Sequence, residues 1–114
     1  MTLHAITQIM PFDYIPKQDR DSDTKTIFKL RPLNGLQHME VLREIDDENR
    51  YTTAAIRLAI KYGLTEWENF TDESGHAIPY SPVTIARLPP FVLHELGMEI
   101  ITRSELGEPA RKNS

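Results

Sequence analysis

The sequence predicts a small α+β fold that is mainly α-helical and forms a single domain over residues 1–114. Short stretches near the N-terminus mix or alternate apolar and polar residues, which is typical of strands. They are followed by longer stretches whose apolar residues recur at helical spacing. A length of 114 residues suits one domain with its own core, and a hydrophobic fraction of 39% indicates that this core is modest.

The N-terminal third predicts a β-hairpin or a pair of edge strands. Residues 6–15 and 25–31 contain the mixed and alternating positions, and residues 17–24 between them contain no apolar side chain. Pro11 and Pro16 lack the N–H group that a sheet ladder requires. The first strand is therefore expected to be short or to lie at an edge of the sheet.

Two helices are predicted next, over about residues 34–45 and 50–62. Asn34 is well placed to cap the first helix, and the acidic residues 46–48 end it or cap the second. The first helix runs through four apolar residues: Leu36, Met39, Leu42 and Ile45. The second carries an apolar stripe of Tyr51, Ala54, Ala55, Leu58 and Tyr62. Gly63 comes next as a candidate C-terminal cap.

A small hairpin is predicted over about residues 66–80, where a polar turn around Gly75 lies between aromatic and apolar residues. Trp67, the only tryptophan, lies in this segment. Its favoured role is to anchor the hairpin in the core. The alternative is a contact with a partner, because tryptophan is enriched at the centres of interfaces.

The C-terminal third predicts two helices and a tail. Ser81 followed by Pro82 is typical of a helix start, which indicates a short helix over about residues 82–88. A pair of prolines then breaks this helix and starts a last one over about residues 90–103. Residues 104–114 are mostly polar and are predicted to form a mobile tail.

The last helix is unusually apolar, so it is either central to the core or has a face for a partner. One stripe is formed by Val92, Leu93, Leu96 and Ile100. Thioethers adapt to varied shapes, so Met39 and Met98 suit a partner-binding surface. The candidate partner-binding residues are Met39, Trp67, Phe91, His94, Met98 and Ile101.

A calcium site is not predicted, although one acidic run has part of the required spacing. Asp19, Asp21 and Asp23 could open a calcium loop, which also needs glycine at its sixth position and glutamate at its twelfth. Thr24 and Leu30 stand at those two positions. The chain also contains no cysteine, which excludes thiolate zinc sites, disulfides and a cysteine nucleophile.

No motif predicts an enzyme or a cofactor. His94 could begin a zinc-protease pattern, but Met98 stands where the second histidine is needed. Asp72, Ser74 and His76 are a carboxylate, a hydroxyl and an imidazole within one turn, where catalytic convergence is rare and local hydrogen bonding is the simpler explanation. The glycines are scattered and form no phosphate-binding loop.

Charge and hydropathy favour a soluble intracellular protein. Thirteen Lys and Arg residues against seventeen Asp and Glu give a formal charge of −4, so nucleic acid is not an expected partner. No positive cluster precedes an apolar run at the N-terminus, which does not favour a signal peptide. The longest nearly apolar stretch, residues 91–101, contains charged residues and is far shorter than a membrane span of about 20 residues, so no membrane is expected.

Several short motifs after about residue 54 carry a family resemblance. In order they are Gly63-Leu64, Trp67-Glu68-Asn69-Phe70, Asp72-x-x-Gly75, Ile78-Pro79-Tyr80-Ser81, Leu88-Pro89, Leu93-x-Glu95-Leu96, Ile100, Ser104-x-Leu106 and Lys112-Asn113-Ser114. With them the chain resembles, over roughly half its length, the small tail assembly chaperones of long-tailed bacteriophages. The N-terminal half adds only Phe28-x-Leu30-Arg31-x-Leu33.

The resemblance implies a non-catalytic role in viral tail assembly. Such chaperones, encoded by phages or prophages, bind the long helical tape measure protein in the host cytoplasm before tail tube subunits polymerise round it. They use no cofactor and are left out of the mature virion. A tail tube subunit and further copies of the chain, in a homo-oligomer, are additional candidate partners. The alternative hypothesis is a virion structural protein, such as a head–tail connector or completion protein.

Overall fold

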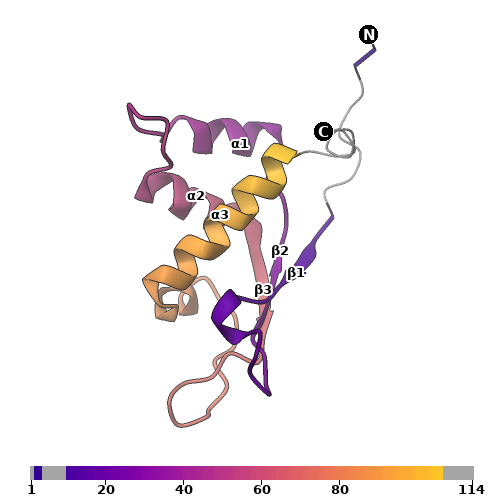
Figure 1. Ribbon diagram of the computed structural model, residues 1–114, viewed down its shortest axis with the longest axis vertical. Helices are drawn as coiled ribbons and strands as arrows, with labels where there is room; N and C mark the ends of the chain where they lie inside the picture. Colours follow the sequence, from indigo (N-terminus) through magenta and orange to yellow (C-terminus); the bar gives the residue numbers. More distant parts are fainter. Residues whose placement is uncertain (1, 4–9, 107–114) are drawn as a thin grey trace.

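A three-stranded antiparallel sheet packs against helices in the computed structural model, which describes residues 2–3 and 10–106 (Figure 1). The elements in chain order are β1 (Phe12–Tyr14), η1 (Lys17–Asp19), β2 (Ile27–Leu30), α1 (Gly35–Leu42), α2 (Thr53–Gly63), β3 (Leu64–Glu68), η2 (Thr84–Arg87) and α3 (Pro90–Leu106). This architecture confirms the predicted α+β class. Among the described residues, no helix is both long enough and apolar enough to cross a membrane.

The sheet has the order β1-β2-β3, with β2 at its centre. β1 and β2 form the predicted N-terminal hairpin, in which Tyr14 lies opposite Phe28. On the other side of β2, Trp67 of β3 also lies opposite Phe28. These three side chains are buried, so they form a row across the apolar face of the sheet. Residues 6–9 of the predicted first strand lie outside the described residues.

The predicted hairpin over residues 66–80 is present only in part. Residues 66–68 belong to β3 and pair with β2 instead of with the residues after them. What remains of the hairpin is a single bridge between Thr71 and Ala77 around the expected turn. Pairing with β2 is favoured because it places the large Trp67 side chain against the core, which a short local hairpin does not provide.

The predicted cap of α1 is confirmed. The Asn34 side chain accepts the Gln37 N–H at 2.9 Å, and the Gln37 side chain accepts the Asn34 N–H at 3.0 Å, which makes a reciprocal capping box. α1 ends at Leu42, earlier than the predicted residue 45. The loop after α1 is organised by Asp46, whose carboxylate accepts the Arg50 N–H at 2.9 Å and also binds the Arg50 side chain.

The buried face of α2 differs from the predicted stripe. Its buried residues are Ala55, Ile56, Ala59, Ile60 and Gly63. Ala54 is exposed and Leu58 only partly buried, so the predicted stripe is wrong by about one position. The error arises from Tyr51 and Tyr62, whose rings lie at the edges of the core while their hydroxyls reach exposed glutamates.

Two glycines allow α2 and α3 to pack closely. A Cβ atom on Gly63 would lie 2.6 Å from Cγ2 of Ile100, and one on Gly97 would lie 2.7 Å from Cγ2 of Ile56. Gly63 is therefore not the predicted C-terminal cap; the cap residue is Leu64. Gly63 is the last residue of α2, and the close approach of α3 explains why a side chain does not fit there.

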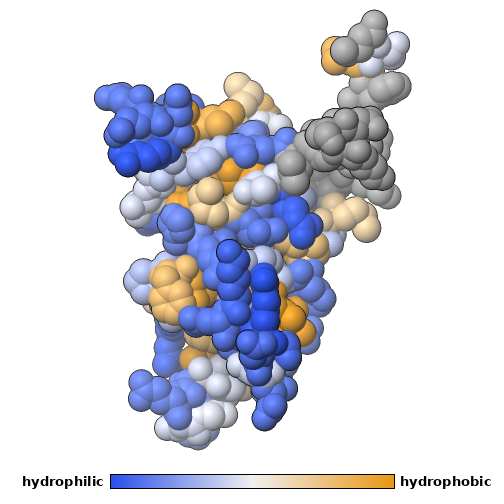
Figure 2. All heavy atoms as spheres, viewed as in Figure 1, coloured by the Kyte–Doolittle hydropathy of each residue, from blue (hydrophilic) through white to orange (hydrophobic). Residues whose placement is uncertain are grey.

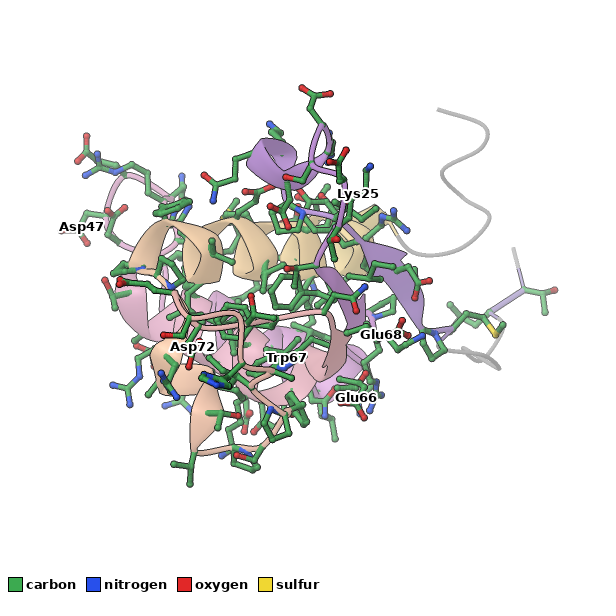
Figure 3. The ribbon with its side chains drawn as sticks, turned by 90° about the horizontal axis from the view of Figure 1, so that it is seen from below. Lys25, Asp47, Glu66, Trp67, Glu68 and Asp72 are labelled. Atoms are coloured by element: carbon green, nitrogen blue, oxygen red, sulfur yellow. The ribbon has the colours of Figure 1, made fainter. Side chains whose placement is uncertain are left out.

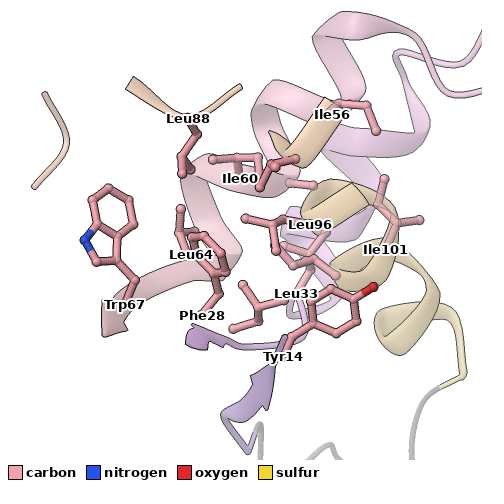
Figure 4. Close-up of a cluster of buried hydrophobic side chains, with 14 of the residues drawn as sticks. Tyr14, Phe28, Leu33, Ile56, Ile60, Leu64, Trp67, Leu88, Leu96 and Ile101 are labelled. Carbon is pink, nitrogen blue, oxygen red and sulfur yellow. The ribbon is translucent and has the colours of Figure 1, made fainter. Parts of the chain in front are cut away.

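The core lies between the sheet and helices α2 and α3, and α3 is its central helix. The buried residues of α3 are Val92, Leu96, Gly97, Ile100 and Ile101. Figure 4 shows side chains from the strands, α2 and α3 pointing into one cluster, with Trp67 at its edge. The predicted short helix over residues 82–88 is the 3₁₀ helix η2. Its N-cap residue is Val83, and the Ser81 hydroxyl just before it accepts the Thr84 N–H at 3.1 Å. α3 continues past the predicted residue 103 to Leu106, and residues 107–114 of the predicted tail lie outside the described residues.

Candidate functional site

Three exposed apolar side chains on α1 form the candidate site. Leu36 is 77% exposed, Met39 62% and Leu42 39%. They recur at every third residue, so they follow a shallow spiral over about a third of the helix surface. Val41 lies outside this spiral and is fully buried. We call Leu36, Met39 and Leu42 the α1 ridge.

Contacts with α2 and α3 hold α1 in place. The Tyr62 hydroxyl of α2 donates a hydrogen bond to Glu40 at 2.5 Å, which is the main reason that the pKa of Tyr62 is raised. At the start of α1, the Leu33 N–H donates to the Ser104 hydroxyl of α3 at 2.8 Å. With the capping box, these bonds fix the orientation of the helix, so the α1 ridge is presented on a firm support.

The other predicted partner-binding residues are divided between surface and core. Phe91 and His94 are exposed near the start of α3. Met98 is only partly buried and packs against the core. Trp67 is 5% exposed and Ile101 0%, so the side chains of both lie in the core. The sequence analysis grouped both with the candidates for partner binding, whereas the structure places their side chains in the core and not on the surface.

Trp67 contacts four residues that lie outside β3. Its ring makes edge-to-face contacts with Phe28, Phe70 and Tyr80, with ring centroids 6.0, 5.2 and 5.1 Å away. Its indole N–H donates to the Ile78 carbonyl at 2.7 Å. This arrangement confirms the favoured prediction that Trp67 anchors the segment after β3 to the core.

Glu95 of α3 binds the N-terminal hairpin. Its carboxylate accepts the Tyr14 hydroxyl at 2.5 Å and the Lys17 N–H at 3.0 Å. Burial, followed by this hydrogen bond, raises the pKa of Tyr14 to about 12. At the other end of α3, Glu105 accepts the Tyr51 hydroxyl, and the pKa of Tyr51 is likewise raised to about 12, by burial and then by this bond.

The acidic turns bind main-chain groups of their own loops. The Asp72 carboxylate accepts the N–H groups of Ser74 and His76, both at 2.9 Å, which lowers the pKa of Asp72. Asp19 accepts the Thr26 N–H at 2.9 Å. In the part of the chain that the structure describes, no group of three or more His, Cys, Asp or Glu side chains could hold a metal ion.

Sequence reasoning placed Leu36 and Leu42 on a helix but did not name them as candidates for partner binding. The spacing of the apolar residues in this segment could have identified them. Side chains at every third position turn progressively around a helix, so a single buried stripe cannot include all of these apolar residues. Figure 2 shows hydrophobic residues in several separate places on one face of the molecule, with hydrophilic residues between them.

No protein-family model, no curated protein and no solved structure matches the chain. The resemblance to tail assembly chaperones therefore stays a prediction from the residues themselves.

Proposed function

We propose that the protein is a non-catalytic binding protein that covers apolar helical segments of a partner through the α1 ridge. The exposure of Leu36, Met39 and Leu42 on a well-anchored helix is the observation that carries this proposal. Burying a large apolar side chain stabilises a complex by about 1.5–3 kcal/mol. Three such side chains next to one another can therefore provide the apolar centre of an interface.

The dimensions of α1 favour an amphipathic helix as the occupant. Its eight residues span about 12 Å, which covers about two turns of a partner helix with apolar residues at i, i+3 or i+4, and i+7. An interface of this length buries less than the roughly 1,200 Å² of a stable complex. Binding at one ridge is then weak and reversible, which suits a protein that has to be released during assembly.

We further propose that the partner is a phage tape measure protein, so that the chain acts as a tail assembly chaperone in the host cytoplasm. The resemblance after residue 54 supports this role. The formal charge of −4 supports it too, because a charged protein helps to keep a complex with a long apolar partner in solution. A chaperone of this kind is absent from the finished virion.

The test is co-purification of the full chain with the tape measure protein of the same phage or prophage. We expect capture by the unaltered chain and its loss on Leu36→Asp with Met39→Asp. Val83→Asp is the matched control, because Val83 is 81% exposed beside η2 and is not part of the α1 ridge. No complex at micromolar concentration, or equal capture by the ridge variant, would contradict the proposal.

Mass spectrometry of purified virions separates the proposed role from the alternative. A chaperone is expected to be missing from the particles. A fixed copy number in the particles would instead identify a structural component, such as a connector or completion protein.

A further inference from the structure

A groove of about 600 Å³ lies between β3 and the segment of residues 77–80. One wall is formed by residues 66–70 and the other by residues 77–80. β3 is the last strand on its side of the described sheet, so its outer main chain faces this groove and not another strand. Figure 1 shows this loop region at the opposite end of the molecule from α1.

Side chains, and not a strand ladder, join the two walls along most of the groove. The Trp67 indole donates to the Ile78 carbonyl at 2.7 Å, and the Tyr80 hydroxyl donates to the Leu64 carbonyl at 2.9 Å. At one end, the main chain closes the groove where the Ile78 N–H meets the Phe70 carbonyl at 2.8 Å.

The outer edge of β3 has a donor that a ligand can take over. The Trp67 N–H is bound by the carboxylate of the neighbouring Glu66 at 3.2 Å. Glu66 is exposed, so its carboxylate can return to water when a carbonyl group replaces it. Main-chain donors and acceptors at an open edge are a template for one more strand.

The same edge is acidic. Glu66 and Glu68 are exposed and alternate with the buried Trp67, and Figure 3 shows them on the side of β3 away from Trp67. Lys29 of β2 lies 3.3 Å from Glu68 and 3.6 Å from Asp13, so one ammonium is shared by two carboxylates. Among the described residues, Glu66 takes part in no ion pair.

The charge of Glu66 also reaches the opposite wall. Burial, followed by this nearby carboxylate, raises the pKa of Tyr80. The negative charge therefore lies beside the groove, where it favours a cationic occupant.

We propose that this groove binds an extended, basic segment of another protein, which adds as a strand to the edge of β3. Lys or Arg side chains at alternate positions of the segment lie opposite Glu66 and Glu68, and an apolar residue between them faces the Trp67 side. β3 has five residues, so the segment in contact with it spans about 17 Å. The site is separate from the α1 ridge and takes a partner of different secondary structure.

Trp67 makes the proposal directly testable, because it is the only tryptophan and lines the groove. The probe is the acetylated and amidated peptide Lys-Val-Lys-Val-Lys, titrated into the full chain while Trp67 emission is recorded. We expect a saturable change. Two control peptides test the two parts of the proposal: Glu-Val-Glu-Val-Glu reverses the charge, and N-methylation of both valines removes main-chain donors. Both controls should bind at least about tenfold more weakly.

Paired variants test the residues. Glu66→Gln with Glu68→Gln should weaken binding of the lysine peptide about fivefold, the effect of losing two exposed ion pairs. Asp21→Asn with Asp47→Asn is the matched control: it removes the same charge from residues that do not line the groove, and should leave the affinity unchanged. If the groove variant does not fold, the peptide controls on the unaltered chain still decide.

Three results would overturn the proposal. The first is no change in Trp67 emission up to about 1 mM peptide, the weak limit of measurable binding. The second is an equal loss of affinity in both charge variants, which would indicate general attraction to an acidic protein. The third is binding of the N-methylated peptide as tightly as the parent, which would exclude strand addition.

Discussion

Replacement of Gly63 by alanine tests the close packing of α2 on α3. The new methyl group would lie 2.6–2.9 Å from three carbon atoms of Ile100, where ordinary contacts are about 3.5–4.0 Å. Ile100 is fully buried and cannot move aside freely. Overpacking of this kind costs about 1–3 kcal/mol, and the better helix propensity of alanine returns up to about 1 kcal/mol. We expect Gly63→Ala to lower the free energy of unfolding by about 1–2 kcal/mol.

The assay is urea unfolding followed by Trp67 fluorescence, with Gly35→Ala as the matched control. Nothing lies within 4 Å of the position that a Cβ on Gly35 would take, so this control should be neutral or slightly stabilising. Ile100→Val removes one of the crowding atoms, so its destabilisation should be less than additive with that of Gly63→Ala. The packing argument is refuted if Gly63→Ala behaves like Gly35→Ala, or if the double variant is strictly additive.

Three further predictions concern a tyrosine, a helix cap and the α1 ridge. Absorbance titration at alkaline pH should show Tyr14 ionising near 12; Glu95→Gln should lower this pKa while leaving it above 10, because burial is the larger cause. Since the folded-state pKa of Tyr14 is raised, its contribution to stability is complete below pH 10 and is lost as the pH rises through about 12. A melting temperature that is unaffected by the ionisation of Tyr14 in this pH range would contradict this expectation. Asn34→Ala should lower the free energy of unfolding in urea by about 1 kcal/mol through loss of the capping box, with Asn34→Asp as the conservative control. Leu36→Ser with Met39→Ser should change stability by less than about 0.5 kcal/mol while reducing the binding of an apolar dye, because both side chains are already in water.

Local signals predicted the starts of α1 and α3 well, whereas α2 begins at Thr53 and not at the predicted residue 50. The cap at Asn34 and the start of α3 at Pro90 depend on residues that are neighbours in the sequence, so the pattern contains all the information. The strand that contains Trp67 was harder, because its partner Phe28 is far away along the chain. Nothing in the local sequence distinguishes pairing with β2 from pairing with the next few residues.

The exposed and buried faces were predicted only in part. Tyr51, just before α2, and Tyr62, on α2, fit the spacing of core residues although their hydroxyls bind exposed glutamates, and this displaced the predicted stripe. On α1, the sequence shows that Leu36 and Met39 are apolar but not that they face water, because their exposure depends on where α2 lies. For the same reason the crowding that requires Gly63 was mistaken for a helix cap.

The proposed role of the α1 ridge is tested most directly by hydrogen exchange of the chain alone and in complex with the tape measure protein. We predict slower exchange of the α1 amides, residues 35–42, in the complex, with no change in η2. Protection elsewhere with unaltered exchange in α1 would contradict the account.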